Sequence, residues 1–150
     1  MYEFWRKWFV AAAAFVTLSG AAMAVVALTP ARWLLTWHVD GAFWPAGVPA
    51  GAAASQAFVV GILGAVLAGW GVTVWSLGRH PLAKREKWAW TTALVAIDVW
   101  FVLDCTGSAV TGAWGNVALN VGFLALLLPP LIGMRGALRS AAPSGRPAVA

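Results

Sequence analysis

Long apolar runs separated by short polar segments dominate this chain. The runs cover about residues 8–28, 56–77, 88–110 and 116–134, each close to the roughly 20 apolar residues that a helix needs to cross a bilayer. Because lipid offers no hydrogen-bond partners to the backbone, such runs fold as helices. The pattern therefore predicts an all-α, polytopic membrane protein with four transmembrane helices in an antiparallel bundle over residues 1–139.

The longest connection between these runs, residues 30–56, is aromatic. It holds Trp33 and Trp37 four positions apart, followed by His38 and Asp40. This spacing places both indole rings on one face of a short helix, and such amphipathic rings settle at headgroup depth. We therefore expect an interfacial aromatic segment between the first and second spans.

Basic residues fall almost entirely on one side of the predicted crossings. Only Arg32 lies on the opposite side; the others are Arg6, Lys7, Arg79, Lys84, Arg85, Lys87, Arg135, Arg139 and Arg146. Positive charge held on the cytoplasmic side fixes the orientation of a membrane protein, which predicts cytoplasmic N- and C-termini. Topology and contact with anionic lipid thus account for the net charge of +5, and no nucleic-acid partner is expected.

Both ends of the chain need separate interpretation. A basic start, an alanine-rich run and the small residues up to Ala24 also resemble a secretory signal with its cleavage site. The apolar run continues past this point to Leu28, so we expect residues 1–24 to be retained. Residues 140–150 are rich in Ala, Pro, Ser and Gly and are expected to form a disordered cytoplasmic tail.

Small residues at spacing four mark the second span. Gly61, Ala65 and Gly69 share one row, and Gly64 with Ala68 forms the neighbouring row. Small side chains allow helix backbones to approach closely in membranes. We expect Gly61, Ala65 and Gly69 to pack against another helix, and a helix of the same chain is favoured over a second copy.

The third span contains two aspartates, Asp98 and Asp104, and no span holds a Lys or Arg to pair with them. An aspartate near a helix centre costs about 2.5–3.5 kcal/mol on the insertion scale. Each carboxyl must therefore be protonated, hydrated from a cavity or hydrogen-bonded. Six residues place the two carboxyls about 120° apart around the helix, so they form no acid/base pair. For Asp98 we expect a neutral carboxyl bonded to Thr17 or Ser19 of the first span, with a proton-carrying site as the alternative.

Asp104 has candidate partners on both helices of the hairpin that the short third connection predicts. Ser108 and Thr111 follow it on the same face, and Asn116 shares a face of the returning helix with Asn120. Asn120 reaches the depth of Asp104, so we expect these two side chains to be in contact. The cluster is interpreted as polar glue between two helices, with a binding site for a proton, a cation or a polar headgroup as the alternative.

No residue pattern in the chain predicts a cofactor or a metal centre. The single cysteine, Cys105, has no partner thiol, and His38 with Asp40 lacks the spacing of metal ligands. Most of the eleven tryptophans fall at predicted interfaces, where indole rings concentrate. Trp70 and Trp100 lie deeper and are expected to pack in the core.

Three segments of the chain stand out as a set: GAVLAGWGV at 64–72, WFVLD at 100–104 and TGAWGNVALN at 111–120. Together they resemble small four-helix inner-membrane proteins of bacteria that carry no assigned function. The resemblance extends over roughly residues 40–133. It implies the same four-helix topology and a bacterial inner-membrane location, and it carries no activity with it.

These features favour a small non-enzymatic membrane module, an accessory or assembly protein that binds membrane lipids or a partner. The partner is another membrane protein or a second copy of the chain. The alternative is a proton- or cation-coupled oligomeric transporter with Asp98 and Asp104 as the titrating groups. A second alternative is a membrane enzyme that acts on a lipid or isoprenoid substrate through Asp104, Asn116 and Asn120.

Overall fold

The computed structural model describes residues 1–140, which form four long helices and one short helix. The helices are α1 (Tyr2–Val26), α2 (Trp33–Phe43), α3 (Ala50–Arg79), α4 (Lys87–Val110) and α5 (Trp114–Ser140), with the 3-10 turns η1 (Pro30–Arg32) and η2 (Leu82–Lys84) in the connections. All but α2 are long and apolar enough to cross a membrane. The predicted all-α, multi-pass fold is confirmed.

The helices extend beyond the predicted apolar runs. α1 begins at Tyr2, and α3 begins at Ala50, six residues before the expected start of the second span. Pro49 precedes α3 with extended backbone, and the alanines that follow it have the highest helix propensity, so the helix starts there. The tail predicted at residues 140–150 lies outside the described residues, apart from Ser140, at which α5 ends.

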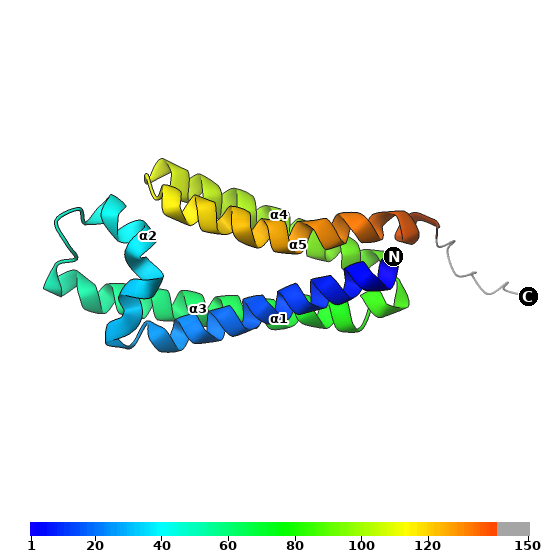
Figure 1. The fold of residues 1–150 in the computed structure, drawn as a ribbon, viewed down its shortest axis with the longest axis horizontal. Helices are drawn as coiled ribbons and strands as arrows, with labels where there is room; N and C mark the ends of the chain where they lie inside the picture. The colour runs from blue at the N-terminus through cyan, green and yellow to red at the C-terminus, as the bar shows by residue number, and fades with distance from the viewer. Residues whose placement is uncertain (141–150) are drawn as a thin grey trace, which may run out of the picture.

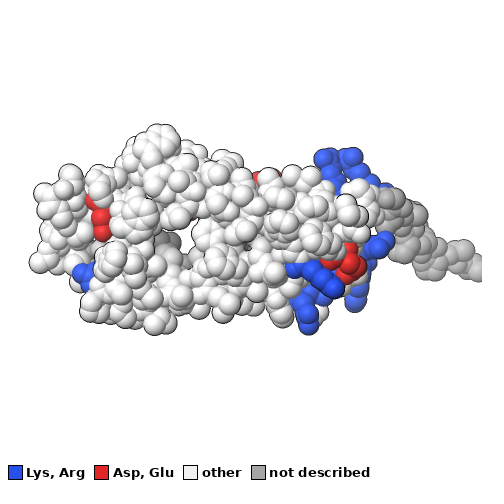
Figure 2. All heavy atoms as spheres, viewed as in Figure 1, with Lys and Arg blue, Asp and Glu red and all other residues white. Residues whose placement is uncertain are grey.

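The long helices form two pairs (Figure 1). α1 packs along α3, and α4 packs along α5 as the predicted hairpin, while α1 and α5 connect the pairs. The pairs converge at the end that holds the N-terminus, and they diverge toward the other end, where α2 lies between them. We call these the basic end and the α2 end, because among residues 1–140 only Arg32 places a Lys or Arg near α2 (Figure 2).

The hydrophobic core fills only the half of the molecule near the basic end. Phe9 of α1, Ile97 of α4, and Leu127, Leu131 and Met134 of α5 are fully buried there. A continuous apolar core of this kind holds the two pairs together. Toward the α2 end no such cluster of buried side chains joins the pairs within the described part of the chain, and this leaves room for a cavity.

Close contact between α1 and α3 depends on small residues on both helices. A Cβ atom added to Gly64 would lie 2.8 Å from the carbonyl oxygen of Gly20 and closer still to the backbone of Ala24. The predicted row is therefore wrong for Ala65 and Gly69: both are exposed, and Gly69 has open space around it. The neighbouring row faces α1 because the small residues of α1 lie opposite it.

Gly61, the third member of the predicted row, lies at the edge of this contact. A Cβ atom there would be 3.9 Å from the carbonyl oxygen of Ala24, an ordinary van der Waals distance. On the facing row, a Cβ atom at Gly71 would lie 2.8 Å from the backbone nitrogen of Thr17. The tight contact thus continues along α3 from Gly64 to Gly71. For the row that contains these two glycines, the prediction of packing against a helix of the same chain is correct.

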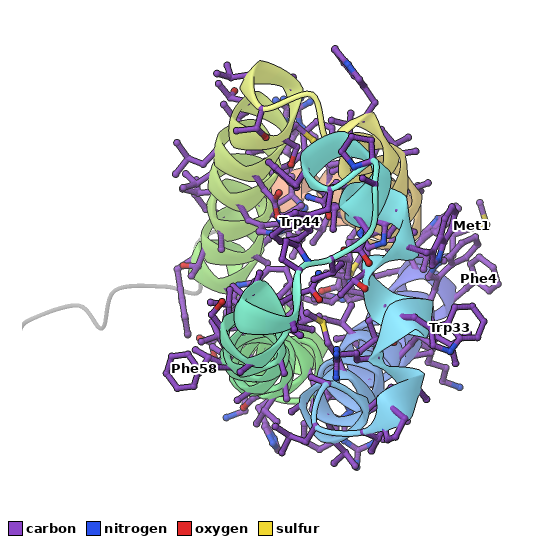
Figure 3. The ribbon with its side chains drawn as sticks, turned by 90° about the vertical axis from the view of Figure 1, so that its left-hand side faces the viewer. Met1, Phe4, Trp33, Trp44 and Phe58 are labelled. Carbon is purple, nitrogen blue, oxygen red and sulfur yellow. The ribbon has the colours of Figure 1, made fainter. Side chains whose placement is uncertain are left out.

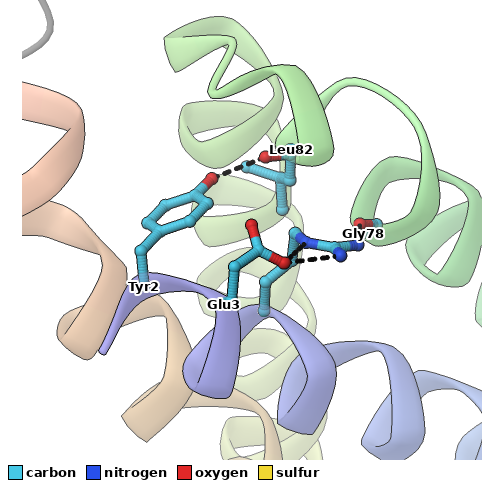
Figure 4. A network of polar contacts seen from close by, with 5 residues as sticks. Tyr2, Glu3, Gly78 and Leu82 are labelled. Carbon is cyan, nitrogen blue, oxygen red and sulfur yellow. Dashed lines mark hydrogen bonds and ion pairs between the residues drawn. The ribbon is translucent and has the colours of Figure 1, made fainter.

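Polar contacts tie the start of α1 to the end of α3 and to η2 (Figure 4). The Tyr2 hydroxyl donates to the carbonyl oxygen of Leu82 at 2.6 Å. The Arg6 guanidinium donates to the Glu3 carboxylate at 2.7 Å and 3.0 Å and to the carbonyl oxygen of Gly78 at 3.2 Å. Hydrogen bonds to charged groups are the stronger ones, so this network fixes the basic end where the helix pairs converge.

α5 continues as a helix through Pro129 and Pro130, although prolines usually interrupt the backbone ladder. Pro130 has no N–H to donate to the carbonyl oxygen of Leu126, four residues earlier. The Trp8 indole N–H of α1 donates to this oxygen instead, at 3.1 Å. A side chain from a different helix therefore satisfies the carbonyl oxygen that Pro130 leaves without its usual donor.

Candidate functional site: a polar cavity at the α2 end

A cavity of about 380 Å³ lies at the α2 end, and its two walls differ in chemistry. Met23 of α1 and Val60 and Leu63 of α3 form an apolar wall, whereas Asp104 and Asn116 contribute polar groups from α4 and α5. The remaining lining residues are Leu35, Thr36, His38, Val39, Phe43, Leu103, Gly107, Ser108, Thr111 and Ala113. The volume falls within the range of small-molecule sites, which are mostly apolar with a few convergent polar groups.

Three polar side chains form a closed set of hydrogen bonds on the polar wall. The Asn116 amide donates to Oδ1 of Asp104 and to Oγ of Ser108, both at 2.8 Å. The Ser108 hydroxyl donates in turn to Oδ1 of Asp104, at 3.2 Å. We call Asp104, Ser108 and Asn116 the polar triad, and it joins α4 to α5 one turn below their connection.

The second carboxylate oxygen of Asp104, Oδ2, differs from the first. Both donors of the triad reach Oδ1, and no donor within residues 1–140 makes a hydrogen bond to Oδ2. A carboxylate can accept about four hydrogen bonds, so the triad leaves acceptor capacity unused on a side chain that lines the cavity. The cavity therefore offers a fixed acceptor to a ligand that carries hydrogen-bond donors.

α2 is held over the cavity by a second polar cluster. The Asp40 carboxylate accepts from the Thr36 hydroxyl at 2.7 Å and from the Gln56 amide of α3 at 2.6 Å. Thr36 is 2% exposed and is the only buried residue of α2. The sequence reasoning missed Thr36 and Gln56; the one signal was that Ser55 and Gln56 interrupt an apolar stretch near the start of α3.

The two tryptophans of α2 face away from the cavity. Trp33 and Trp37 are 61% and 67% exposed, and Figure 3 shows Trp33 pointing outward from the bundle. α2 forms the short helix predicted for this segment. Exposed indole rings on a helix that caps a membrane bundle are suited to headgroup depth. The interfacial position of these two rings stays a prediction.

His38 marks the place where α2 meets α5. Its backbone lies so close to Gly115 that an added Cβ atom would be 3.1 Å from the carbonyl carbon of His38 and would overlap its oxygen. The His38 side chain lines the cavity and is partly buried. Gly115 therefore sets how closely α2 can cover the polar triad.

Replacing Gly115 with leucine should push α2 away from α5. The overlap of a side chain with the His38 backbone is expected to destabilise α2 docking by about 1–3 kcal/mol, which raises the population of the opened state by roughly 5- to 150-fold. Hydrogen–deuterium exchange of the amides in residues 33–43 measures this opening. Gly122→Leu, seven residues further along α5 where a Cβ meets open space, should leave the exchange of α2 unchanged; equal acceleration in both variants would refute the contact.

The other two predicted members of the cluster, Thr111 and Asn120, do not bond to Asp104. The Asn120 amide, although buried, lies 3.7 Å from the sulfur of Cys105, so the expected contact between Asp104 and Asn120 is wrong and Asn116 takes that place. The Thr111 hydroxyl donates to backbone oxygens of its own helix, at Gly107 and Ser108. The hairpin turn places Asn116, one turn nearer the connection, opposite Asp104.

The expected hydrogen bond between Asp98 and α1 does not form. Thr17 donates its hydroxyl to the Ala13 carbonyl oxygen of its own helix at 2.9 Å, and Asp98 is exposed on α4. No residue in the described range 1–140 donates a hydrogen bond to Asp98 or forms an ion pair with it. The six-residue spacing from Asp104 turns Asp98 about 120° away from the polar triad, so it does not belong to the cavity.

Residues 1–140 contain no group of three or more His, Cys, Asp or Glu side chains placed to hold a metal ion. Asp40 bonds to Thr36 and Gln56, and Asp104 bonds within the polar triad. The cavity therefore offers one carboxyl group with unused acceptor capacity on one wall and apolar side chains on the other.

The chain has no match among protein-family models, curated proteins or solved structures. The resemblance to four-helix inner-membrane proteins of bacteria stays a prediction.

Proposed function

We propose that the protein is a small non-enzymatic module of a bacterial inner membrane that binds an amphiphile, with the polar headgroup in the cavity at the α2 end. In the proposed orientation, the basic end lies at the cytoplasmic surface, as the distribution of Lys and Arg favours. The cavity then lies in the outer leaflet beneath the aromatic helix α2. The observation that carries the proposal is the polar triad on one wall of a cavity whose opposite wall is apolar.

The unused oxygen of Asp104 selects the class of headgroup. It is an acceptor, and the neighbouring amide and hydroxyl of the polar triad already point at Oδ1. Hydrogen bonds between an ionised donor and a carboxylate are about twice as strong as neutral ones. An amphiphile with an ammonium headgroup therefore fits this wall better than one with an anionic or purely hydroxylic headgroup.

The other two functions suggested by the sequence have less support. A transporter would need a polar route past the basic half, which the buried side chains Phe9, Ile97 and Leu131 fill. Asp98 also points away from the cavity, so the two aspartates share no route within one chain. An enzyme built on Asp104, Asn116 and Asn120 loses support because Asn120 is turned to Cys105.

Native mass spectrometry with added lipids tests the headgroup preference. Phosphatidylethanolamine should bind more tightly than phosphatidylglycerol with the same acyl chains, because only the former carries an ammonium group. Asp104→Asn removes the charge but keeps an acceptor, so it should weaken phosphatidylethanolamine binding by about tenfold, the equivalent of one charge-assisted hydrogen bond. Asp104→Leu should abolish the preference between the two lipids.

Thr106→Val provides the matched control, since Thr106 is exposed on α4, two residues from Asp104, and does not line the cavity. This variant should bind lipid like the unmodified protein. Circular dichroism of each variant checks that the helices are retained. Equal binding of the two lipids by the unmodified protein, or a preference that survives Asp104→Leu in a folded protein, would contradict the proposal.

A further inference from the structure

The outward face of α4 carries a continuous stripe of exposed residues that no other helix of residues 1–140 covers. Thr91, Val95, Asp98 and Val102 follow one another at spacings of four, three and four, and all of them are exposed. This alternation is the spacing of the seam along which helices pack in coiled coils, and membrane helices use the same left-handed packing. We call these residues the α4 stripe.

Asp98 stands at the centre of the α4 stripe and at the middle of the span. It follows Lys87, the first residue of α4, by eleven residues, or about 16 Å at 1.5 Å per residue. Its neighbours along the stripe are the apolar side chains Val95 and Val102, 53% and 58% exposed. A carboxyl at mid-bilayer depth normally faces the protein interior or pairs with another group, and within residues 1–140 Asp98 does neither.

The partner that Asp98 lacks can be specified by its chemistry. We infer that the α4 stripe docks a transmembrane helix of a different membrane protein, which carries a Lys or Arg at mid-bilayer depth to pair with Asp98. Charge complementarity is the argument: a carboxyl group flanked on both sides by exposed valines is matched by a single cation at the same depth. The flanking valines would supply the packing surface on either side of this ion pair.

A second copy of the chain does not meet this requirement. A two-fold symmetric contact through the stripe places each residue opposite itself at equal depth, so Asp98 would face Asp98. No helix of residues 1–140 carries a Lys or Arg near its middle. The basic residues lie toward helix ends, as Arg79 and Lys87 do. The observations therefore favour a heteromeric partner, independently of whether the cavity binds an amphiphile.

Synthetic single-span peptides in phosphatidylcholine vesicles test this inference on the full-length protein. Three leucine–alanine peptides that differ only in their central residue, Lys, Leu or Glu, are labelled for energy transfer to the labelled protein. The Lys peptide should bind about tenfold more tightly than the Leu peptide. Asp98→Glu should keep this preference, Asp98→Asn should remove it, and Asp98→Lys should transfer it to the Glu peptide.

Three results would overturn the inference. One is equal binding of the Lys and Leu peptides by the unmodified protein. Another is a Lys preference that survives Asp98→Asn in a protein whose circular dichroism is unchanged. The third is self-association of the protein that excludes all three peptides and is lost in Asp98→Asn, which would identify a second copy as the occupant of the α4 stripe.

Discussion

Gly64→Leu is expected to separate α1 from α3 and to lower the stability of the protein by about 3 kcal/mol or more. A side chain at this position would overlap the backbones of Gly20 and Ala24, and rigid backbone cannot move aside as the end of a side chain can. Overpacking a tight contact costs about 1–3 kcal/mol where side chains can adjust, so overlap with backbone sets a larger penalty. Unfolding by sodium dodecyl sulfate in mixed micelles, followed by tryptophan fluorescence, measures the loss.

The matched control is Gly69→Leu on the same helix. An added Cβ atom at Gly69 meets open space, and leucine has a higher helix propensity than glycine by nearly 1 kcal/mol. Gly69→Leu should therefore keep or slightly raise the stability. Equal destabilisation by both substitutions would mean that the row containing Gly69 also makes a tight contact, and that the assigned α1–α3 interface is wrong.

Trp8→Phe is expected to destabilise the protein because it removes the indole N–H that donates to the Leu126 carbonyl oxygen. Pro130, four residues after Leu126, has no N–H to take its place. An unsatisfied carbonyl group in the bilayer has no water to replace the lost bond. The expected loss is about 1–2 kcal/mol. In a Pro130→Ala background the same substitution should be less harmful, because residue 130 then provides the N–H of the ordinary helix ladder.

A double-mutant cycle isolates this coupling from the loss of indole surface. Trp88→Phe is the control, since Trp88 also lies near the basic end but its indole donates to the neighbouring Glu86 carboxylate. Its effect should be the same with and without Pro130. If the cost of Trp8→Phe is also independent of Pro130, then the indole contributes only packing, and the account of how α5 passes through two prolines fails.

The sequence predicted the spans because their signal is strong: runs of about 20 apolar residues leave few alternatives. The hairpin of α4 and α5 followed from the short connection between them. The row of small residues on α3 was assigned wrongly because Gly61, Ala65 and Gly69 and the neighbouring row satisfy the same spacing rule. Only the matching residues on α1, such as Gly20, could have distinguished the two rows.

The sequence predicted the polar triad of the candidate site but missed the contacts that hold α2 over it. Asp104, Ser108 and Asn116 come together as one cluster, yet depth counting assigned the contact with Asp104 to Asn120. A turn of helix separates these two asparagines, and the geometry of the connection decides between them. The contact of Asp40 with Gln56 depends on how α2 folds back over the bundle, which local periodicity does not encode.

Asp98 illustrates a different limit of the sequence. Its position in an apolar span shows that the carboxyl needs a partner, and the nearest assumption was a partner in the same chain. The fold instead turns Asp98 outward, because the buried face of α4 is set by Ala89, Ala93 and Ile97, which pack in the core. Periodicity within one span does not reveal whether the partner of such a carboxyl lies in the same chain or in another.

The central claim is that the cavity at the α2 end binds a lipid headgroup. Photo-crosslinking with a lipid that carries an ammonium headgroup tests it most directly. A diazirine placed beside the headgroup should mark residues 103–108 of α4 and residues 36–39 of α2, and Asp104→Leu should remove these products. Labelling confined to exposed surfaces, such as the apolar groove lined by Trp8, Phe15 and Leu126, would show that lipid only surrounds the bundle. That result would contradict the proposed function.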